Sequence, residues 1–127
     1  MPLRTKRWDD DVEPDDGLRL LITRYRPRGL PKWAENWHDW WPELAPSKEL
    51  HAGAYGKGGL KISWPIYVRR FYAEMKSPDA QARLAELRAR LAKGETITLL
   101  CSSACVRESR CHRSLLRAIL EEGAIDN

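Results

Sequence analysis

The amino-acid sequence predicts an α/β fold, in which a small, mostly parallel β-sheet of three to four strands packs against helices in Rossmann-like layers. The first observation is the run "TITLLC" (residues 96–101), which has the pattern of a strand buried on both faces. The second is that helical patterns flank this run, forming half of a parallel α/β unit. The third is that 127 residues with 43% hydrophobic content suffice for one core, which predicts a single domain over residues 1–127.

The amino-terminal half contains two predicted extended segments. Residues 3–8 (LRTKRW) alternate apolar and basic side chains, and residues 18–25 (LRLLITRY) are apolar and partly β-branched. Prolines, aspartates and a glycine between them indicate a turn. Residues 33–41 place four tryptophans at helical spacing, so we predict a helix there. The glycine-rich residues 47–61 (SKELHAGAYGKGGLK) are predicted to form a mobile loop.

Three helices are predicted in the carboxy-terminal half. Residues 63–75 follow the capping residue Ser63 and carry a stripe of large apolar side chains. The next helix begins after Ser77, with Pro78 in its first turn, and ends at Gly94. The last helix is expected from about Ser109 to Gly123. This order places the buried strand 96–101 between two helices.

Composition narrows the class of protein. No apolar stretch approaches the ~20 residues that a membrane span needs, and the acidic amino terminus does not resemble a signal peptide, so we expect a cytoplasmic protein without membrane contact. Three cysteines within eleven positions suggest reduced thiols rather than a disulfide framework. The net charge is +4 and arginine outnumbers lysine by 15 to 7. Because guanidinium groups suit phosphates, a phosphate-bearing small molecule or a nucleic acid is the expected partner.

The cysteine-containing segment leaves three interpretations open. A zinc site would use Cys101, Cys105, Cys111 and His112, but adjacent residues on a helix point about 100° apart, so we predict no metal and no cofactor. A nucleophile is the second interpretation, because Cys101 ends a buried strand and is followed, at C-x5-R spacing, by Arg107. In the third, Cys111 packs in the core as a small hydrophobe. Arg113 and Arg117 are expected to face solvent or a partner.

Several motifs, in the same order along nearly the whole chain, resemble the YeaO-like proteins, domain-of-unknown-function family 488. An acidic loop followed by Asp-Gly and then an arginine and a Pro-Arg-Gly turn is matched by Asp16, Gly17, Arg19, Arg24, Pro27, Arg28 and Gly29. A Cys…Cys-His-Arg pattern of some family branches is similar to Cys101 and Cys111-His112-Arg113. The resemblance implies a small α/β domain, no established activity, and a polar set formed by Arg24, Arg28 and His112.

These observations combine into a hypothesis about function. We expect a pocket at the carboxyl end of the strand 96–101 that binds an anionic, phosphate-bearing ligand. Its predicted residues are Cys101 and His112 as catalytic groups and Arg24, Arg28, Ser102 and Arg113 as ligand-binding groups. Two alternatives remain: a nucleic-acid-binding module using the arginine and tryptophan face, and a thiol-dependent enzyme using Cys101.

Overall fold

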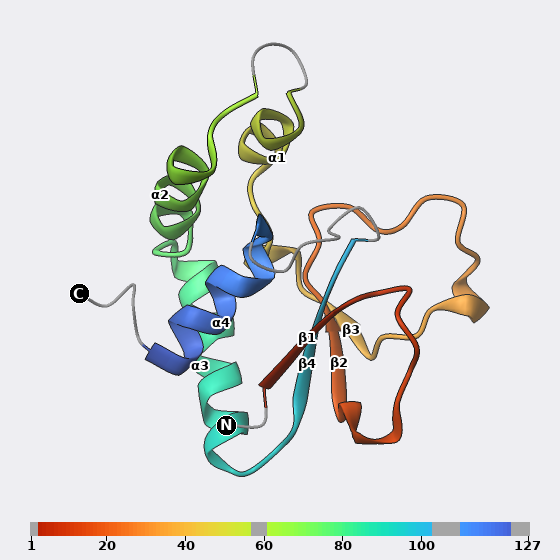
Figure 1. The fold of residues 1–127 in the computed structure, drawn as a ribbon. Helices are drawn as coiled ribbons and strands as arrows, with labels where there is room; N and C mark the ends of the chain where they lie inside the picture. Colours follow the sequence, from red (N-terminus) through yellow and green to blue (C-terminus); the bar gives the residue numbers. More distant parts are fainter. Residues whose placement is uncertain (1–2, 57–60, 103–109, 123–127) are drawn as a thin grey trace.

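The computed structural model describes residues 3–56, 61–102 and 110–122 and contains one parallel sheet (Figure 1). Its four strands are β1 (Leu3–Arg7), β2 (Leu18–Leu21), β3 (Asp39–Trp40) and β4 (Ile97–Cys101), in the spatial order β1-β4-β2-β3. All three pairings are parallel, and β4 lies between β1 and β2. The predicted α/β fold is confirmed. β2 is shorter than the predicted extended segment 18–25.

The described helices gather on one side of the sheet (Figure 1). They are α1 (Lys48–Tyr55), α2 (Trp64–Glu74), α3 (Pro78–Ala92) and α4 (His112–Glu122). Short 3-10 helices cover Pro14–Asp16, Lys32–Ala34 and Pro42–Leu44 in the connections. None of the helices that the structure describes has the length and apolar character needed to cross a bilayer.

Side-chain caps explain where the first three helices begin. The hydroxyl oxygens of Ser47, Ser63 and Ser77 accept the backbone N–H groups three residues further on, which satisfies donors that have no partner within the helix. The predicted caps Ser63 and Ser77 are therefore confirmed. The prediction of a loop over residues 47–61 is wrong for α1. There Ser47 starts a helix that ends at Gly56, whose φ of 73° is the left-handed conformation typical of a helix end.

The predicted tryptophan helix over residues 33–41 does not form. Trp33 lies in a 3-10 helix and is 87% exposed, Trp40 belongs to β3, and Trp41 is buried. The backbone N–H of Trp41 donates to the carbonyl of Leu21 at 2.8 Å, because this segment pairs with β2 as an extended chain. Sheet pairing therefore outweighs the helical spacing of the aromatic side chains, and no row of four tryptophans exists on one helix face.

The two faces of the sheet differ in chemistry because side chains alternate along each strand. Leu3, Leu20, Ile97 and Leu99 belong to the apolar cluster that the helices cover. The opposite face carries three register neighbours, Arg4 on β1, Thr98 on β4 and Arg19 on β2. In Figure 1 no labelled helix lies on this second side, which instead faces the loops that follow β1 and β2.

A buried carboxylate organises that polar face. Asp16 is 1% exposed and accepts hydrogen bonds from Arg19, which is 2% exposed, and from the Glu13 backbone N–H at 3.1 Å. Lys6 Nζ lies 2.8 Å from the same carboxylate. Burial raises the pKa of Asp16, but Lys6, the Glu13 N–H and Arg19 outweigh it and hold the pKa at about 2. The acidic loop is thus fixed to the sheet by an ion-pair network.

Candidate functional site

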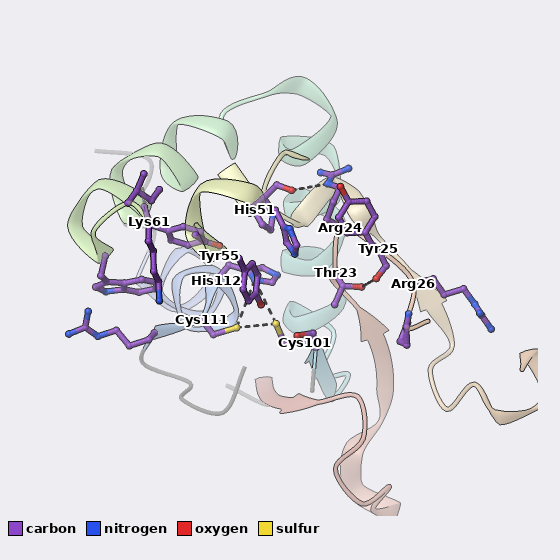
Figure 2. Close-up of a pocket in the computed structure, with 18 residues that line it drawn as sticks. Thr23, Arg24, Tyr25, Arg26, His51, Tyr55, Lys61, Cys101, Cys111 and His112 are labelled. Carbon is purple, nitrogen blue, oxygen red and sulfur yellow. Dashed lines mark hydrogen bonds between the residues drawn. The ribbon is translucent and has the colours of Figure 1, made fainter. Parts of the chain in front are cut away.

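Two sulfurs and an imidazole nitrogen converge at the carboxyl end of β4 (Figure 2). The Sγ atoms of Cys101 and Cys111 lie 3.0 Å apart. The Nδ1 atom of His112 lies 3.7 Å from the Cys101 sulfur and 3.8 Å from the Cys111 sulfur. All three residues are buried. We refer to Cys101, Cys111 and His112 as the Cys-Cys-His cluster.

Local structure explains why two adjacent residues can contribute to one cluster. α4 begins at His112, so Cys111 lies just before the helix and its direction is not set by helical geometry. The expectation that the two side chains diverge assumed a helix starting near Ser109, and it is wrong. Cys101 reaches the cluster as the last residue of β4, whereas Cys105 and Arg107 lie in 103–109, outside the described residues.

The tautomer of the neutral His112 ring follows from its hydrogen bond. Its Nε2 atom lies 2.7 Å from the carbonyl oxygen of Ile22. A carbonyl oxygen only accepts, so Nε2 must carry the proton and donate it. In the neutral ring Nδ1 is then the nitrogen with the lone pair, and it faces the two sulfurs. The ring of Phe71, 5.6 Å away between centroids, packs on the imidazole and helps to fix its orientation.

The cluster lies at the wall of a cavity of about 570 Å³. Cavities of this size hold small-molecule ligands. Its eighteen described lining residues include four cationic side chains, Arg24, Arg26, Lys61 and Arg110, and no aspartate or glutamate. The described lining therefore carries a net positive charge and thiols, and none of its residues is a carboxylate that would neutralise the cations.

Aromatic rings form much of the remaining wall. On one side the ring of His51 from α1 lies between Tyr25 and Tyr55, at centroid distances of 5.2 and 4.8 Å. On the other side Trp64 stacks on Tyr67 from α2, with centroids 5.2 Å apart. Such flat, amphipathic side chains can contact a planar group in a ligand while their polar atoms stay hydrated.

The structure places the predicted ligand-binding residues in different surroundings. Ser102 and Arg24 line the cavity, but the guanidinium of Arg24 donates to the carbonyl of Pro46 at 2.7 Å and to that of Pro42 at 3.0 Å. Arg28 is exposed and does not line the cavity. Arg113 is 6% exposed and is also outside the lining, so the expectation that it faces solvent or a partner is wrong.

Several lining residues were not identified from the sequence. Lys61 and Arg110 are both exposed, and the Arg110 guanidinium lies 5.9 Å from the centre of the Trp64 ring. Trp64 belongs to the stripe of apolar side chains along residues 63–75, but it is only half-buried and lines the cavity. The sequence did contain a signal for these lining residues, because Tyr55, Lys61 and Trp64 lie close to the glycine-rich segment. Binding residues are often found on loops of this kind.

Comparison with known proteins identifies the family. The family model DUF488-N3a, described as "Active DUF488-N3 subclade", matches residues 3–124. The chain belongs to the DUF488 family. Uncharacterized protein YeaO of Escherichia coli (strain K12) is 31% identical to this DUF488 chain over 104 residues, which are 81% of the chain and 84% of YeaO. Uncharacterized protein Rv3073c of Mycobacterium tuberculosis (strain ATCC 25618 / H37Rv) is 31% identical over 88 residues, 69% of the chain and 72% of that protein. No solved structure matches the DUF488 chain significantly.

Proposed function

We propose that the cavity binds a small anionic, phosphate-bearing molecule. The observation that carries the proposal is the composition of the lining, in which Arg24, Arg26, Lys61 and Arg110 stand without a carboxylate among the described lining residues. The cavity also lies where the parallel strands end, the edge at which α/β folds commonly bind ligands.

The four cations are not equally available to a ligand. Arg24 donates to backbone carbonyls, and Arg26 forms an ion pair with Glu35 and donates to the Leu30 carbonyl at 3.0 Å. Within the described part of the chain, no carboxylate pairs with Lys61 or Arg110. A phosphate oxygen at ~4 Å from either charge gains about 4 kcal/mol of Coulomb energy at an effective dielectric constant of ~20, before desolvation is subtracted. Lys61 and Arg110 are therefore the proposed phosphate ligands.

Calorimetric titration with inorganic phosphate and with nucleoside monophosphates tests this proposal. Lys61→Gln and Arg110→Gln should each weaken binding about tenfold, since one charge-assisted hydrogen bond contributes ~1.5–3 kcal/mol. Arg28→Gln removes the same charge from the surface outside the lining and should leave the dissociation constant within about twofold. Equal affinity in all four proteins, or no binding in any of them, would contradict the proposal. Tighter binding of the monophosphates than of phosphate would indicate that the aromatic walls contact the base.

The contact between Cys101 and His112 favours a second candidate function, thiol-dependent catalysis. The lone pair of His112 Nδ1 is positioned to accept the thiol proton 3.7 Å away, and Cys101 lines the cavity in which a substrate would bind. Iodoacetamide modification of Cys101, followed by mass spectrometry, should slow at least about tenfold in His112→Gln and stay unchanged in His51→Gln. An equal rate in all three proteins would exclude the imidazole as the base.

The nucleic-acid alternative stays a prediction with less support. It depended in part on a helical row of tryptophans, but Trp33 lies in a 3-10 helix, Trp40 belongs to β3, and Trp37 and Trp41 lie in irregular chain. A cytoplasmic location also stays a prediction. Cys101 and Cys111 form no disulfide, as is usual for cysteines in the reducing cytosol.

A further inference from the structure

We propose that the Cys-Cys-His cluster is a binding site for a soft divalent metal ion, with Zn²⁺ as the expected occupant. One sulfur from the end of β4, one sulfur from the residue before α4 and the Nδ1 atom of the first residue of α4 lie within 4.8 Å of one another. Thiolate sulfur and imidazole nitrogen are the ligand types that zinc prefers. The proposal goes beyond anion binding and does not depend on it.

The distances fit a tetrahedral ion after a small adjustment. With Zn–S bonds of ~2.3 Å and a Zn–N bond of ~2.0 Å, tetrahedral angles place sulfur and nitrogen about 3.5 Å apart and two sulfurs about 3.8 Å apart. The two sulfur–nitrogen distances in the cluster are 3.7 and 3.8 Å. The sulfur–sulfur distance is 3.0 Å, so the thiols must separate by somewhat less than about 1 Å to admit the ion. Cys111 lies outside the helix, so a rotation of its side chain is the adjustment that the proposal requires.

The second nitrogen of His112 provides an independent argument. Histidines that bind a metal through one ring nitrogen nearly always donate the other N–H to a carboxylate or a backbone carbonyl, which fixes both the tautomer and the ring plane. His112 Nε2 makes this bond to the Ile22 carbonyl at 2.7 Å. The nitrogen that faces the sulfurs is thus the one that can coordinate, and it is held in place by the residue that follows β2.

Charge and access also agree with a zinc site. Two buried thiolates would be costly without compensation, whereas with Zn²⁺ the group of two thiolates and one ion is neutral. All three residues line the cavity, so a fourth coordination position can open toward it. Three protein ligands and one open position are the arrangement of catalytic rather than structural zinc sites. A bound ion there would act as a Lewis acid toward an oxygen of a molecule in the cavity.

The test uses the full chain carrying Cys105→Ser, so that Cys101 and Cys111 are its remaining thiols. Protein reduced with a phosphine and freed of metal is titrated with Co²⁺ and then with Zn²⁺. We expect one ion per chain, visible absorption bands of tetrahedral cobalt with a thiolate-to-metal charge-transfer band, and loss of these bands as Zn²⁺ displaces Co²⁺.

Variants assign the ligands. Cys101→Ser, Cys111→Ser and His112→Gln should each weaken Zn²⁺ binding by more than the ~10–100-fold that loss of an outer partner costs. His51→Gln, which changes a histidine of the same cavity outside the cluster, should bind as the parent does. No stoichiometric binding in the parent, or unchanged affinity in all of the three cluster variants, would overturn the proposal.

A second measurement requires no cluster variant and therefore stands even if one of them does not fold. In the Cys105→Ser parent, Zn²⁺ should slow alkylation of both remaining thiols at least about tenfold, and a chelator should restore the rate. Alkylation that Zn²⁺ does not change would also overturn the metal site. The phosphate titration is carried out separately, with and without the ion. Failure of the metal site can therefore be distinguished from failure of the proposed phosphate binding.

Discussion

Replacement of Asp16 by asparagine tests whether a single buried carboxylate holds the acidic loop against the sheet. Asp16→Asn keeps the shape of the side chain but leaves the guanidinium of Arg19, 2% exposed, without its charged partner. Removing one member of a buried ion pair typically costs ~3–5 kcal/mol, and the amide can still accept the Glu13 N–H, so we expect about 3 kcal/mol at pH 7.

The pH dependence of this loss can be worked out from the pKa. Asp16 keeps its charge in the folded protein down to a pKa of about 2, whereas the ordinary pKa of this carboxyl, expected in the unfolded chain, is 3.8. Because its folded-state pKa is lowered, its contribution is complete above about pH 5 and is lost as the pH falls toward 2. A difference of nearly two pKa units corresponds to about 2–3 kcal/mol.

Urea denaturation of the wild type and of Asp16→Asn at pH 7 and near pH 2 measures this contribution directly. The gap in unfolding free energy between them should shrink from about 3 kcal/mol to below about 1 kcal/mol as the pH is lowered. Asp15→Asn is the control, because that side chain is 77% exposed and its ion pair with Arg4 should contribute less than ~1 kcal/mol. A gap that is the same at both pH values would refute the assignment of this stability to the Asp16 charge.

Three further substitutions and one control, Gly29→Ala, probe the scaffold by urea denaturation at pH 7. Gly17→Ala should destabilise the fold by more than ~2 kcal/mol, because φ is +65° and the new Cβ would lie 2.2 Å from the Thr96 carbonyl oxygen. Gly29→Ala, with open space around the new Cβ, should cost only about 1 kcal/mol. Equal losses in the two variants would contradict the steric argument. Ser47→Ala removes the cap of α1 and the hydroxyl contact with Glu74, for an expected loss of ~1–2 kcal/mol, and no loss would mean that the cap is not needed. Phe71→Ala opens a cavity in the core beside the imidazole and should cost ~3–5 kcal/mol, while a loss below ~1 kcal/mol would show that the site collapses around it.

Much of the fold could be predicted because its signals are local. In α3 a capping serine, a proline in the first turn and the buried residues Leu84, Leu87 and Leu91 on one face lie within a single stretch of chain. The same holds for β4, whose five residues are all buried, as an unbroken apolar run predicts. The prediction of a helix over the tryptophan segment 33–41 failed for the opposite reason. Its conformation depends on hydrogen bonds to β2, and helical spacing cannot reveal a partner strand.

The candidate site was predictable in part. The position of Cys101 followed from the end of a buried strand, and the position of His112 from a helix start near it. The convergence of Cys111 with His112 was not predicted, because it depends on α4 beginning at His112 rather than near Ser109. The walls formed by Lys61 and Arg110 come together only through tertiary packing of segments that are distant in sequence.

The position of β4 in the sheet has a consequence for biosynthesis. The strands β1 and β2 are each bonded to β4 and not to each other, although β4 is the last of the four to be made. A ribosome that has translated the first ninety residues therefore carries a chain whose two longest early strands still have an unfilled gap between them. Closure of this gap requires pairing across a large separation in sequence, which slows folding. Until residue 101 has emerged from the exit tunnel, the edges of β1 and β2 that pair with β4 in the folded protein are open to pairing with other chains.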